Sequence, residues 1–118
     1  MSKILYEMPI PSVNHSYIPI RRKDGKLGIA KKKQTNSYSE GLGWIAKEKF
    51  KTASIVDIHM IIDFYIKNMS RDIDNMLKAV LDGLINIVYI DDRQVKQILV
   101  NKYKSDKDRV EIEIVEVS

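Results

Sequence analysis

The sequence contains no cysteine, which excludes disulfide bonds and thiolate-bound metal centres. It also has no apolar run of the ~18 residues that a membrane-spanning helix needs. Glycine and proline are sparse, at 5 and 3 among 118 residues, and no repeat, linker or low-complexity tract is present. These absences leave an ordinary folded chain, and we expect no membrane partner.

The length and composition predict one domain that spans residues 1–118, with 44% apolar residues to form its core. The stretch Met1–Ile4 lacks the apolar segment of a secretory signal, and with the absence of cysteine this favours a cytoplasmic location. The net charge of +4 is unevenly distributed, since residues 1–53 carry an excess of Lys and Arg whereas residues 54–118 carry an excess of acids. A basic front half can neutralise phosphates, and an acidic back half can hold a cation.

The apolar patterns predict an α+β fold, with a mixed β-sheet and two main helices in a single domain. The expected order is a strand, two short strands, a helix, a long strand, a helix and two final strands, at residues 3–10, 17–20, 27–30, 37–51, 54–66, 73–88, 94–103 and 110–117. The nearly continuous apolar run 54–66 predicts a central strand that is buried on both faces. The two final strands are expected to form a hairpin with each other.

A basic hairpin is predicted in the front half, because Asp24-Gly25 is a favoured turn pair between the two short strands. We interpret its cations as a phosphate-binding arm, with a merely solvated loop as the alternative. The residues concerned are Arg21, Arg22, Lys23, Lys31, Lys32 and Lys33.

Three single residues have competing interpretations. Trp44, the only tryptophan, is expected to anchor the core rather than to stack on a nucleobase. His59 is expected to be a structural histidine rather than a metal ligand. Asp63 is a further acid that could belong to a site, although we favour a structural role.

The most informative stretch is the acidic segment at residues 71–92. Asp72 is placed to cap a helix that starts at Ile73, because a carboxylate accepts bonds from the free N–H groups of the first turn. Asp74, Lys78 and Asp82 follow at i, i+4 and i+8, which puts them on one stripe of that helix. The chain then reaches the adjacent pair Asp91-Asp92.

Carboxylates that converge repel one another unless a cation lies among them, and Mg²⁺ prefers carboxylate, water and phosphate oxygens. A nearby lysine can hold a phosphate or offset negative charge in a transition state. The alternative is that Asp72 is only a helix cap, Asp74 and Lys78 only an exposed pair, and Asp91-Asp92 only a turn.

These residues also resemble a known family. The segment D-I-D-N at 72–75, together with Lys78, Asp82 and Asp91-Asp92, resembles the core of the RusA family of Holliday junction resolvases. The run Pro9–Asn14 is similar to the opening motif of that family. The resemblance covers almost the whole chain.

The resemblance implies that Asp72, Asp74 and Asp92 are metal-binding acids and that Lys78 is a catalytic lysine. Asp91 stays open as an alternative metal ligand to Asp92, which we favour. Asn75 is expected to hold a carboxylate or a water, and Asn14 and Arg71 are expected to contact DNA. The expected cofactor is Mg²⁺, and Mn²⁺ suits the same oxygen ligands.

The sequence therefore predicts a metal-dependent endodeoxyribonuclease that resolves four-way DNA junctions by paired phosphodiester hydrolysis. Two cuts related by a twofold axis need two acidic clusters, so we expect a homodimer. The alternatives are a structure-selective nuclease on other branched or duplex nucleic acid, and a DNA-binding dimer without catalysis.

Overall fold

The computed structural model describes residues 2–10, 17–21, 27–31 and 33–117, and the side chains of residues 2–10 and 37–117. The elements follow the predicted order, and η2 is a single 3-10 turn that precedes β5. Their bounds are β1 Ser2–Tyr6, β2 Tyr17–Arg21, β3 Leu27–Lys31, α1 Lys33–Lys49, β4 Asp57–Ile66, α2 Ile73–Leu84, η2 Asp92–Gln94, β5 Val95–Lys104 and β6 Arg109–Val117.

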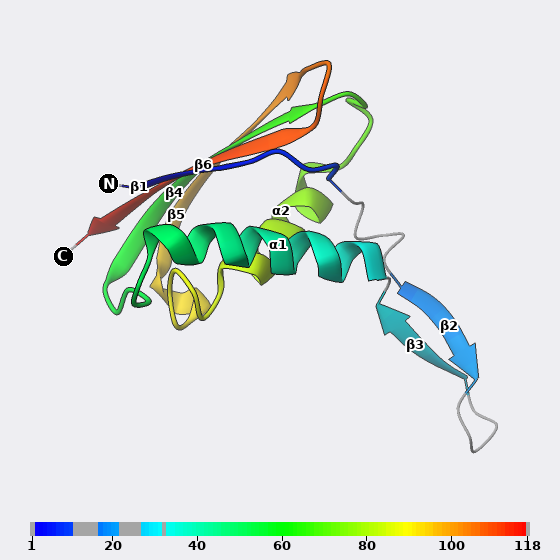
Figure 1. Cartoon of the computed structure of the whole chain (residues 1–118), viewed down its shortest axis with the longest axis horizontal. Coiled ribbons are helices and arrows are strands. Elements are labelled where there is room, and N and C mark those ends of the chain that lie inside the picture. Colours follow the sequence, from blue (N-terminus) through cyan, green and yellow to red (C-terminus); the bar gives the residue numbers. More distant parts are fainter. Residues whose placement is uncertain (1, 11–16, 22–26, 32, 118) are drawn as a thin grey trace.

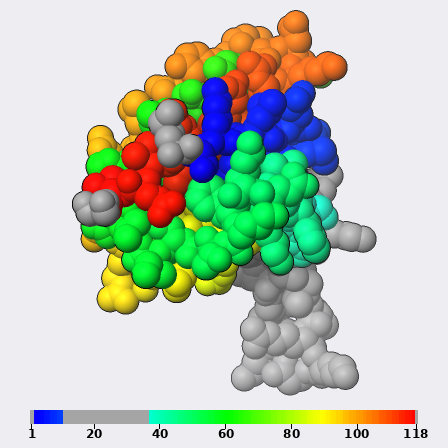
Figure 2. All heavy atoms as spheres, turned by 60° about the vertical axis from the view of Figure 1, so that its left-hand side comes forward, coloured from blue at the N-terminus to red at the C-terminus, as the bar shows by residue number. Residues whose placement is uncertain are grey.

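Four strands form a mixed sheet in the order β1-β6-β4-β5, in which only the β4–β5 pair is parallel. Figure 1 shows both helices on the same side of this sheet, with α1 lying across α2. In Figure 2, β1 in blue lies beside β6 in red, in agreement with their antiparallel pairing. The predicted α+β class with a mixed sheet and two main helices is confirmed.

The predicted hairpin between the two final strands is wrong, because β4 lies between β5 and β6. The core-facing side of β4 is entirely apolar and buried, so a central position gives this strand ladder partners along both of its edges. The more exposed β5 takes the edge of the sheet instead. The parallel β4–β5 pair, with α2 between the strands in the sequence, makes a strand–helix–strand unit.

The prediction that β4 is buried on both faces is also wrong. Residues Ile58, Met60, Ile62 and Phe64 face the helices and are buried, whereas the alternate residues from His59 to Tyr65 are only half-buried. The reason is that the helices cover one face of the sheet. Asp63 lies on the other face, where its carboxylate accepts a hydrogen bond of 2.9 Å from the Asn101 amide, and this bond agrees with the structural role that we favoured.

The helix α2 ends at Leu84 instead of continuing to Val88 as its apolar spacing predicted. Asn86 adopts a positive φ of 68°, a conformation that asparagine tolerates better than most residues. Its backbone N–H donates to the Tyr89 carbonyl at 2.6 Å, and the Val88 N–H donates to the Leu84 carbonyl at 2.8 Å. The apolar residues after Leu84 therefore belong to a tight turn and not to a further turn of helix. This turn directs the chain back towards α2.

Trp44 is not a core anchor, since 73% of its surface is exposed. The buried side of α1 is formed by Tyr38, Leu42 and Ala46, which follow one another at i, i+4 and i+8. Trp44 lies two residues from both Leu42 and Ala46, or about 200° around the helix, and so faces the solvent. The sequence prediction followed the usual burial of tryptophan, but the phase of the helix decided its position.

The predicted β2–β3 hairpin is confirmed as an antiparallel pair, with Arg21 opposite Leu27. Figure 1 shows it beyond the first residues of α1, away from the four-stranded sheet. Arg21, Lys31 and Lys33 lie in elements whose backbone alone is described at these positions, and Asn14, Arg22, Lys23 and Lys32 lie outside the described residues. None of the helices in the described part of the chain combines the length and apolar composition needed to cross a bilayer.

Candidate active site

A groove of about 310 Å³ lies along the exposed side of α2. Its apolar lining comes from Leu77, Leu81 and Ile85. Its polar lining comes from two parts of the chain that are distant in sequence, and consists of Asp74, Lys78, Asp82 and Asp92. Three carboxylates and one ammonium group therefore line a single opening.

Helical spacing explains three of these four residues. Asp74, Lys78 and Asp82 are four residues apart on α2, which stacks them one turn above another on the same face. Asp92 comes from the first position of η2, after the turn that ends α2. The tight turn at residues 85–89 is thus what returns the chain to the helix and brings Asp92 to the groove.

Tyr89 lies under the acidic side of this groove. Its side chain is fully buried, and its hydroxyl donates a long hydrogen bond of 3.5 Å to the Leu81 carbonyl. Burial raises the pKa of the Tyr89 hydroxyl above its usual range, and the negative charges of Asp92 and Asp82 raise it further. The hydroxyl is therefore close to both carboxylates, in agreement with their convergence on one groove.

Three of the four polar side chains that line the groove are available to a ligand. Asp74, Lys78 and Asp92 are exposed. Within the part of the chain that the structure describes, their charged groups form no ion pair and their side chains accept or donate no hydrogen bond. An acid or lysine whose charge is not used inside the protein can interact with solvent, a cation or a phosphate at little cost.

Asp72 stands at the N-cap of α2, as predicted, with extended backbone angles of φ −74° and ψ 132°. The predicted capping bond is absent, and no backbone N–H of the first turn donates a hydrogen bond to the Asp72 carboxylate. It accepts instead a long bond of 3.4 Å from the Asn75 amide. Asp72 is exposed two residues before Asp74, but it is not one of the residues that line the groove.

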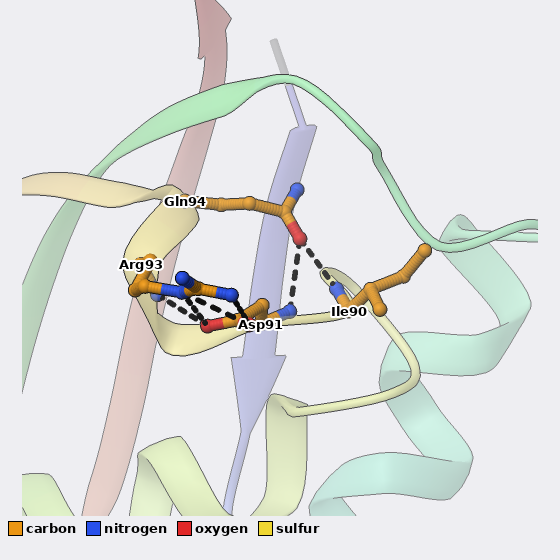
Figure 3. A network of polar contacts seen from close by, with 4 residues as sticks. All are labelled: Ile90, Asp91, Arg93 and Gln94. Carbon is orange, nitrogen blue, oxygen red and sulfur yellow. Dashed lines mark hydrogen bonds and ion pairs between the residues drawn. The ribbon is translucent and has the colours of Figure 1, made fainter.

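The neighbouring acid Asp91 has a different environment from Asp92. Its carboxylate accepts hydrogen bonds from the Arg93 backbone and guanidinium, at 2.9 Å and 3.0 Å, and Gln94 completes a reciprocal cap on the backbone N–H of Asp91 (Figure 3). The hydrogen bonds from Arg93 lower the pKa of the Asp91 carboxyl. Asp91 does not line the groove, so the adjacent acids separate into one that holds the turn and one that faces the opening.

Gln94 anchors this turn to the rest of the fold. Its side-chain amide donates to the Ser54 and Val56 carbonyls at 2.7 Å and 2.9 Å, and its oxygen accepts from the Ile90 N–H at 2.8 Å. Figure 3 shows the oxygen of Gln94 directed at the backbone of Ile90 and Asp91. These bonds fix the segment that carries Asp92.

The chemistry of the donors fits a hard divalent cation, because the groove offers carboxylate oxygens and no sulfur or imidazole ligand among the described residues. The side chains as folded do not form a complete ligand set. No group of three or more His, Cys, Asp or Glu residues in the described part of the chain stands close enough together to hold a metal ion. Exposed aspartates such as Asp74 can change rotamer at small cost, so their positions around a shared groove are more informative than their individual orientations.

Arg71 lies outside this groove, although it precedes Asp72 directly. Its guanidinium is 3.8 Å from the Asp108 carboxylate, and Nη1 has no hydrogen-bond partner. It lines a separate opening of about 530 Å³ together with Lys67 and Lys107. Arg71 therefore precedes α2 in an opening of mixed charge, which Glu7 and Asp108 also line, and not in the groove that Asp92 lines.

Comparison with known proteins identifies the chain. Residues 8–115 match the family described as Endodeoxyribonuclease RusA, which covers most of the chain and all elements of the sheet except β1 and the end of β6. The chain belongs to the RusA family. The resemblance found on residues 72–92 is therefore confirmed at the level of the family.

Two relatives of this RusA family member have recorded names. The "Crossover junction endodeoxyribonuclease rusA" of Lactococcus phage r1t is 29% identical over 111 residues, which cover 83% of this chain and 85% of the phage protein. The "Uncharacterized protein YqaN" of Bacillus subtilis (strain 168) is 47% identical over 47 residues, which cover 40% of this chain and 33% of that protein. The second match thus spans about a third of its relative.

The sequence prediction gave no metal-binding or catalytic role to Asp82, which lines the groove, or to Tyr89, which is buried under it. Asp82 was placed on the same helical stripe as Asp74 and Lys78, and this spacing was the signal that could have assigned it to the site. Tyr89 carried no such signal, because an aromatic residue in an apolar run resembles any other core residue. Only the turn after α2 shows that its hydroxyl approaches the acids.

Proposed function

We propose that this RusA family member is a divalent-metal-dependent endonuclease that resolves four-way DNA junctions as a homodimer. The observation that carries the proposal is the single groove shared by Asp74, Lys78, Asp82 and Asp92. Membership of the RusA family and the name of the phage relative support the choice of a branched DNA substrate.

The residues have distinct tasks in this proposal. Asp74 and Asp92 would hold Mg²⁺ or Mn²⁺ with Asp72 as a further ligand, and Asp82 would add negative charge beside them. A bound divalent ion supplies neutralisation of the phosphate and a more acidic water. Lys78 is placed between two of the acids on α2, where its ammonium can offset the negative charge that develops on the phosphorus centre.

Asp91 is left out of the ligand set, although the sequence could not separate it from Asp92. Its two carboxylate oxygens already accept bonds from Arg93, and using them for a metal would remove the cap of η2. The Asn75 amide orients the Asp72 carboxylate through its hydrogen bond of 3.4 Å.

The homodimer follows from the reaction. Resolution needs two cuts in strands related by a twofold axis, and one chain carries one such groove. Light scattering after size-exclusion chromatography is expected to give twice the 13.7 kDa mass of the chain. A monomer at all concentrations, alone and with junction DNA, would contradict the paired mechanism.

The decisive experiment replaces one groove acid. The Asp74→Asn substitution keeps the shape of the side chain but removes its charge, so we expect junction binding to persist while cleavage in Mg²⁺ falls on the order of 10²–10³-fold. The matched control is Asp106→Asn, which changes an exposed aspartate in the turn between β5 and β6. Cleavage should be measured on a four-way junction and on a linear duplex of the same sequence.

Each alternative predicts a different result. Equal cleavage of the junction, flap and linear substrates would indicate a nuclease without junction selectivity. Binding of the junction with no cleavage by the unaltered protein, in Mg²⁺ or Mn²⁺, would indicate a non-catalytic DNA-binding dimer. Cleavage by Asp74→Asn at the original rate would remove this residue from the mechanism.

A further inference from the structure

A second groove lies directly beside the first. Its volume is about 650 Å³, within the range of sites that bind small organic ligands, and it runs between α1 and the turn that follows α2. Asp82 and Ile85 line both grooves, so the two are adjacent. A DNA strand with a phosphate in the acidic groove would therefore have neighbouring nucleotides within reach of this second one.

Trp44 forms part of the wall of this second groove. Tryptophan is usually among the more buried residues of a soluble domain, yet 73% of this side chain is exposed. Exposure of a flat indole ring beside a groove leaves a surface on which another planar group can stack. The packing of α1 produces this exposure, because the opposite side of the helix already fills the core.

Positive charge accompanies the indole ring. The Lys47 ammonium lies 5.9 Å from the centre of the Trp44 ring, and Lys51 also lines the groove. A nucleotide carries a planar base and an anionic phosphate on one unit, so a ring and two ammonium groups on one wall match both parts. The remaining wall includes Phe50 and Ile87, which are apolar and suit the base rather than the phosphate.

The wall is held firmly in place. A Cβ added at Gly43 would come within 2.7 Å of the Ile87 side chain and 3.1 Å of the Gly83 carbonyl, so this glycine lets α1 approach the turn after α2 closely. Trp44 is the next residue along α1, so its backbone has a fixed position relative to that turn. An aromatic side chain has only two rotatable bonds and therefore loses little conformational entropy when a ligand stacks on it.

We propose that this groove binds an unpaired nucleotide of the DNA substrate, with its base stacked on Trp44 and its phosphate beside Lys47 and Lys51. The proposal rests on the proposed function, since it places the nucleotide next to the cleavage groove. A four-way junction interrupts the continuous stacking of bases at its branch point, where a base can leave its pair most easily, and a stacking site next to the acids would hold the branch point near them. Recognition by stacking tolerates different bases, because each base has a π face.

The protein itself contains the probe for this test, since Trp44 is its only tryptophan. A single-stranded oligonucleotide of roughly eight residues, within the usual range of single-strand sites, should quench tryptophan fluorescence when titrated in EDTA. An abasic oligonucleotide of the same length and charge is the matched ligand, and it should bind about tenfold more weakly with little quenching. The Asp74→Asn protein should show the same quenching as the unaltered protein.

Substitutions separate stacking from charge. With a fluorescently labelled oligonucleotide, Trp44→Ala should bind the normal strand about tenfold more weakly, Trp44→Phe should retain part of that affinity, and neither should change binding of the abasic strand. The aromatic control is Tyr103→Ala, on the sheet face away from the helices. Lys47→Gln should weaken both strands alike, whereas Lys96→Gln on exposed β5 should not.

Several results would overturn the proposal. One is DNA binding without any change in Trp44 fluorescence, and another is a Trp44→Ala protein that binds the normal strand as tightly as the unaltered protein does. A dimer that dissociates on Trp44→Ala would assign the groove to a protein contact instead. None of these outcomes depends on cleavage, so the nuclease proposal could stand while this one fails. Conversely, undiminished cleavage by Asp74→Asn would count against the nuclease proposal without affecting the stacking site.

Discussion

At the scale of single residues, two adjacent acids have acquired opposite tasks. Asp91 is tied to Arg93 and to the backbone of η2, whereas Asp92 faces the groove and approaches the buried hydroxyl of Tyr89. Neighbouring residues at the start of a turn point in different directions, so only one of a pair of acids can face a given opening. The same logic separates Asp72, at the end of α2, from Asp74 on its side.

This division predicts different phenotypes for two equivalent substitutions. Asp92→Asn should lower junction cleavage on the order of 10²–10³-fold with an unchanged melting temperature, because it removes a charge exposed in the groove. Asp91→Asn should keep most of the cleavage activity but lower the melting temperature slightly, because it weakens the ion pair and the cap of η2. Cleavage assays and thermal unfolding of both variants provide the measurement. The reverse pattern would show that Asp91 is the acid of the site.

A second residue-scale prediction concerns acid stability. The Lys3 ammonium, 3.0 Å from Glu111, lowers the pKa of the Glu111 carboxyl, and Arg109 assists from 3.3 Å. A carboxyl with a lowered folded-state pKa contributes stability that is complete above its unfolded pKa, about 4.3, and is lost as the pH falls through the folded value. Urea unfolding should therefore show that Glu111→Gln is less stable than the unaltered protein at neutral pH.

The difference should shrink as the pH falls below about 4, since the unaltered protein then loses the same contribution. The control Glu48→Gln, at an exposed position of α1, should follow the unaltered protein across the whole range. A constant difference between Glu111→Gln and the unaltered protein at every pH would show that packing, and not ionisation, accounts for the effect.

At the scale of elements, the contact between α1 and α2 sets the walls of the second groove, whose lining comes from both helices and the turn after α2. Ser39 donates a hydrogen bond of 2.8 Å across this contact to the Ala79 carbonyl. Gly83 of α2 faces the same part of α1, and a Cβ at this position would lie 2.7 Å from the Ser39 carbonyl oxygen. The glycine is thus required by the close approach of two backbones.

Gly83→Ala tests this contact, because two effects oppose each other. Alanine favours helix by about 1 kcal/mol relative to glycine, but a rigid carbonyl at 2.7 Å cannot move aside without shifting α1. Overpacking of this kind costs about 1–3 kcal/mol, so we expect a net loss of stability in urea unfolding. Glu48→Ala on the exposed side of α1 should change stability by less than about 0.5 kcal/mol. A more stable Gly83→Ala protein would mean that the helices can separate freely.

The bounds of the elements were predicted less well than their order. The apolar repeat of α2 continues past Leu84, so spacing alone predicted a helix to Val88. The turn at Asn86 ends the helix, because Val88 and Tyr89 reach the core through this turn and not through a further turn of α2. Such competition between local spacing and tertiary burial is not visible in a single sequence.

At the scale of the whole molecule, the two halves of the chain have different electrostatic characters. The acids of the groove belong to α2 and η2, whereas a large share of the cations lies in or next to the β2–β3 hairpin. Figure 1 places this hairpin beyond the start of α1, so that it extends the surface that DNA could contact. A dimer would present two such hairpins and two grooves to one junction.

The hairpin predicts a change in salt dependence. Replacing Arg21, Arg22 and Lys23 together by glutamine should weaken junction binding and flatten the plot of log affinity against log salt by about 0.9 for each phosphate interaction that is removed. Replacing Lys96, Lys102 and Lys104 on β5 provides a control with the same change of charge at the sheet edge. Fluorescence anisotropy at several salt concentrations is the measurement. An unchanged slope would make the hairpin a solvated loop.

The sequence by itself determined the fold class, the order of the elements and the family, because apolar periodicity and the spacing of acids along one helix are local properties. Tertiary structure alone decided the order of strands in the sheet, the exposure of Trp44 and which of Asp91 and Asp92 faces the groove. Each of these depends on which surfaces meet across long sequence distances. The turn after α2 is the clearest case, since its buried bend returns the chain so that Asp92 lines the same groove as Asp74, which the local pattern could only suggest.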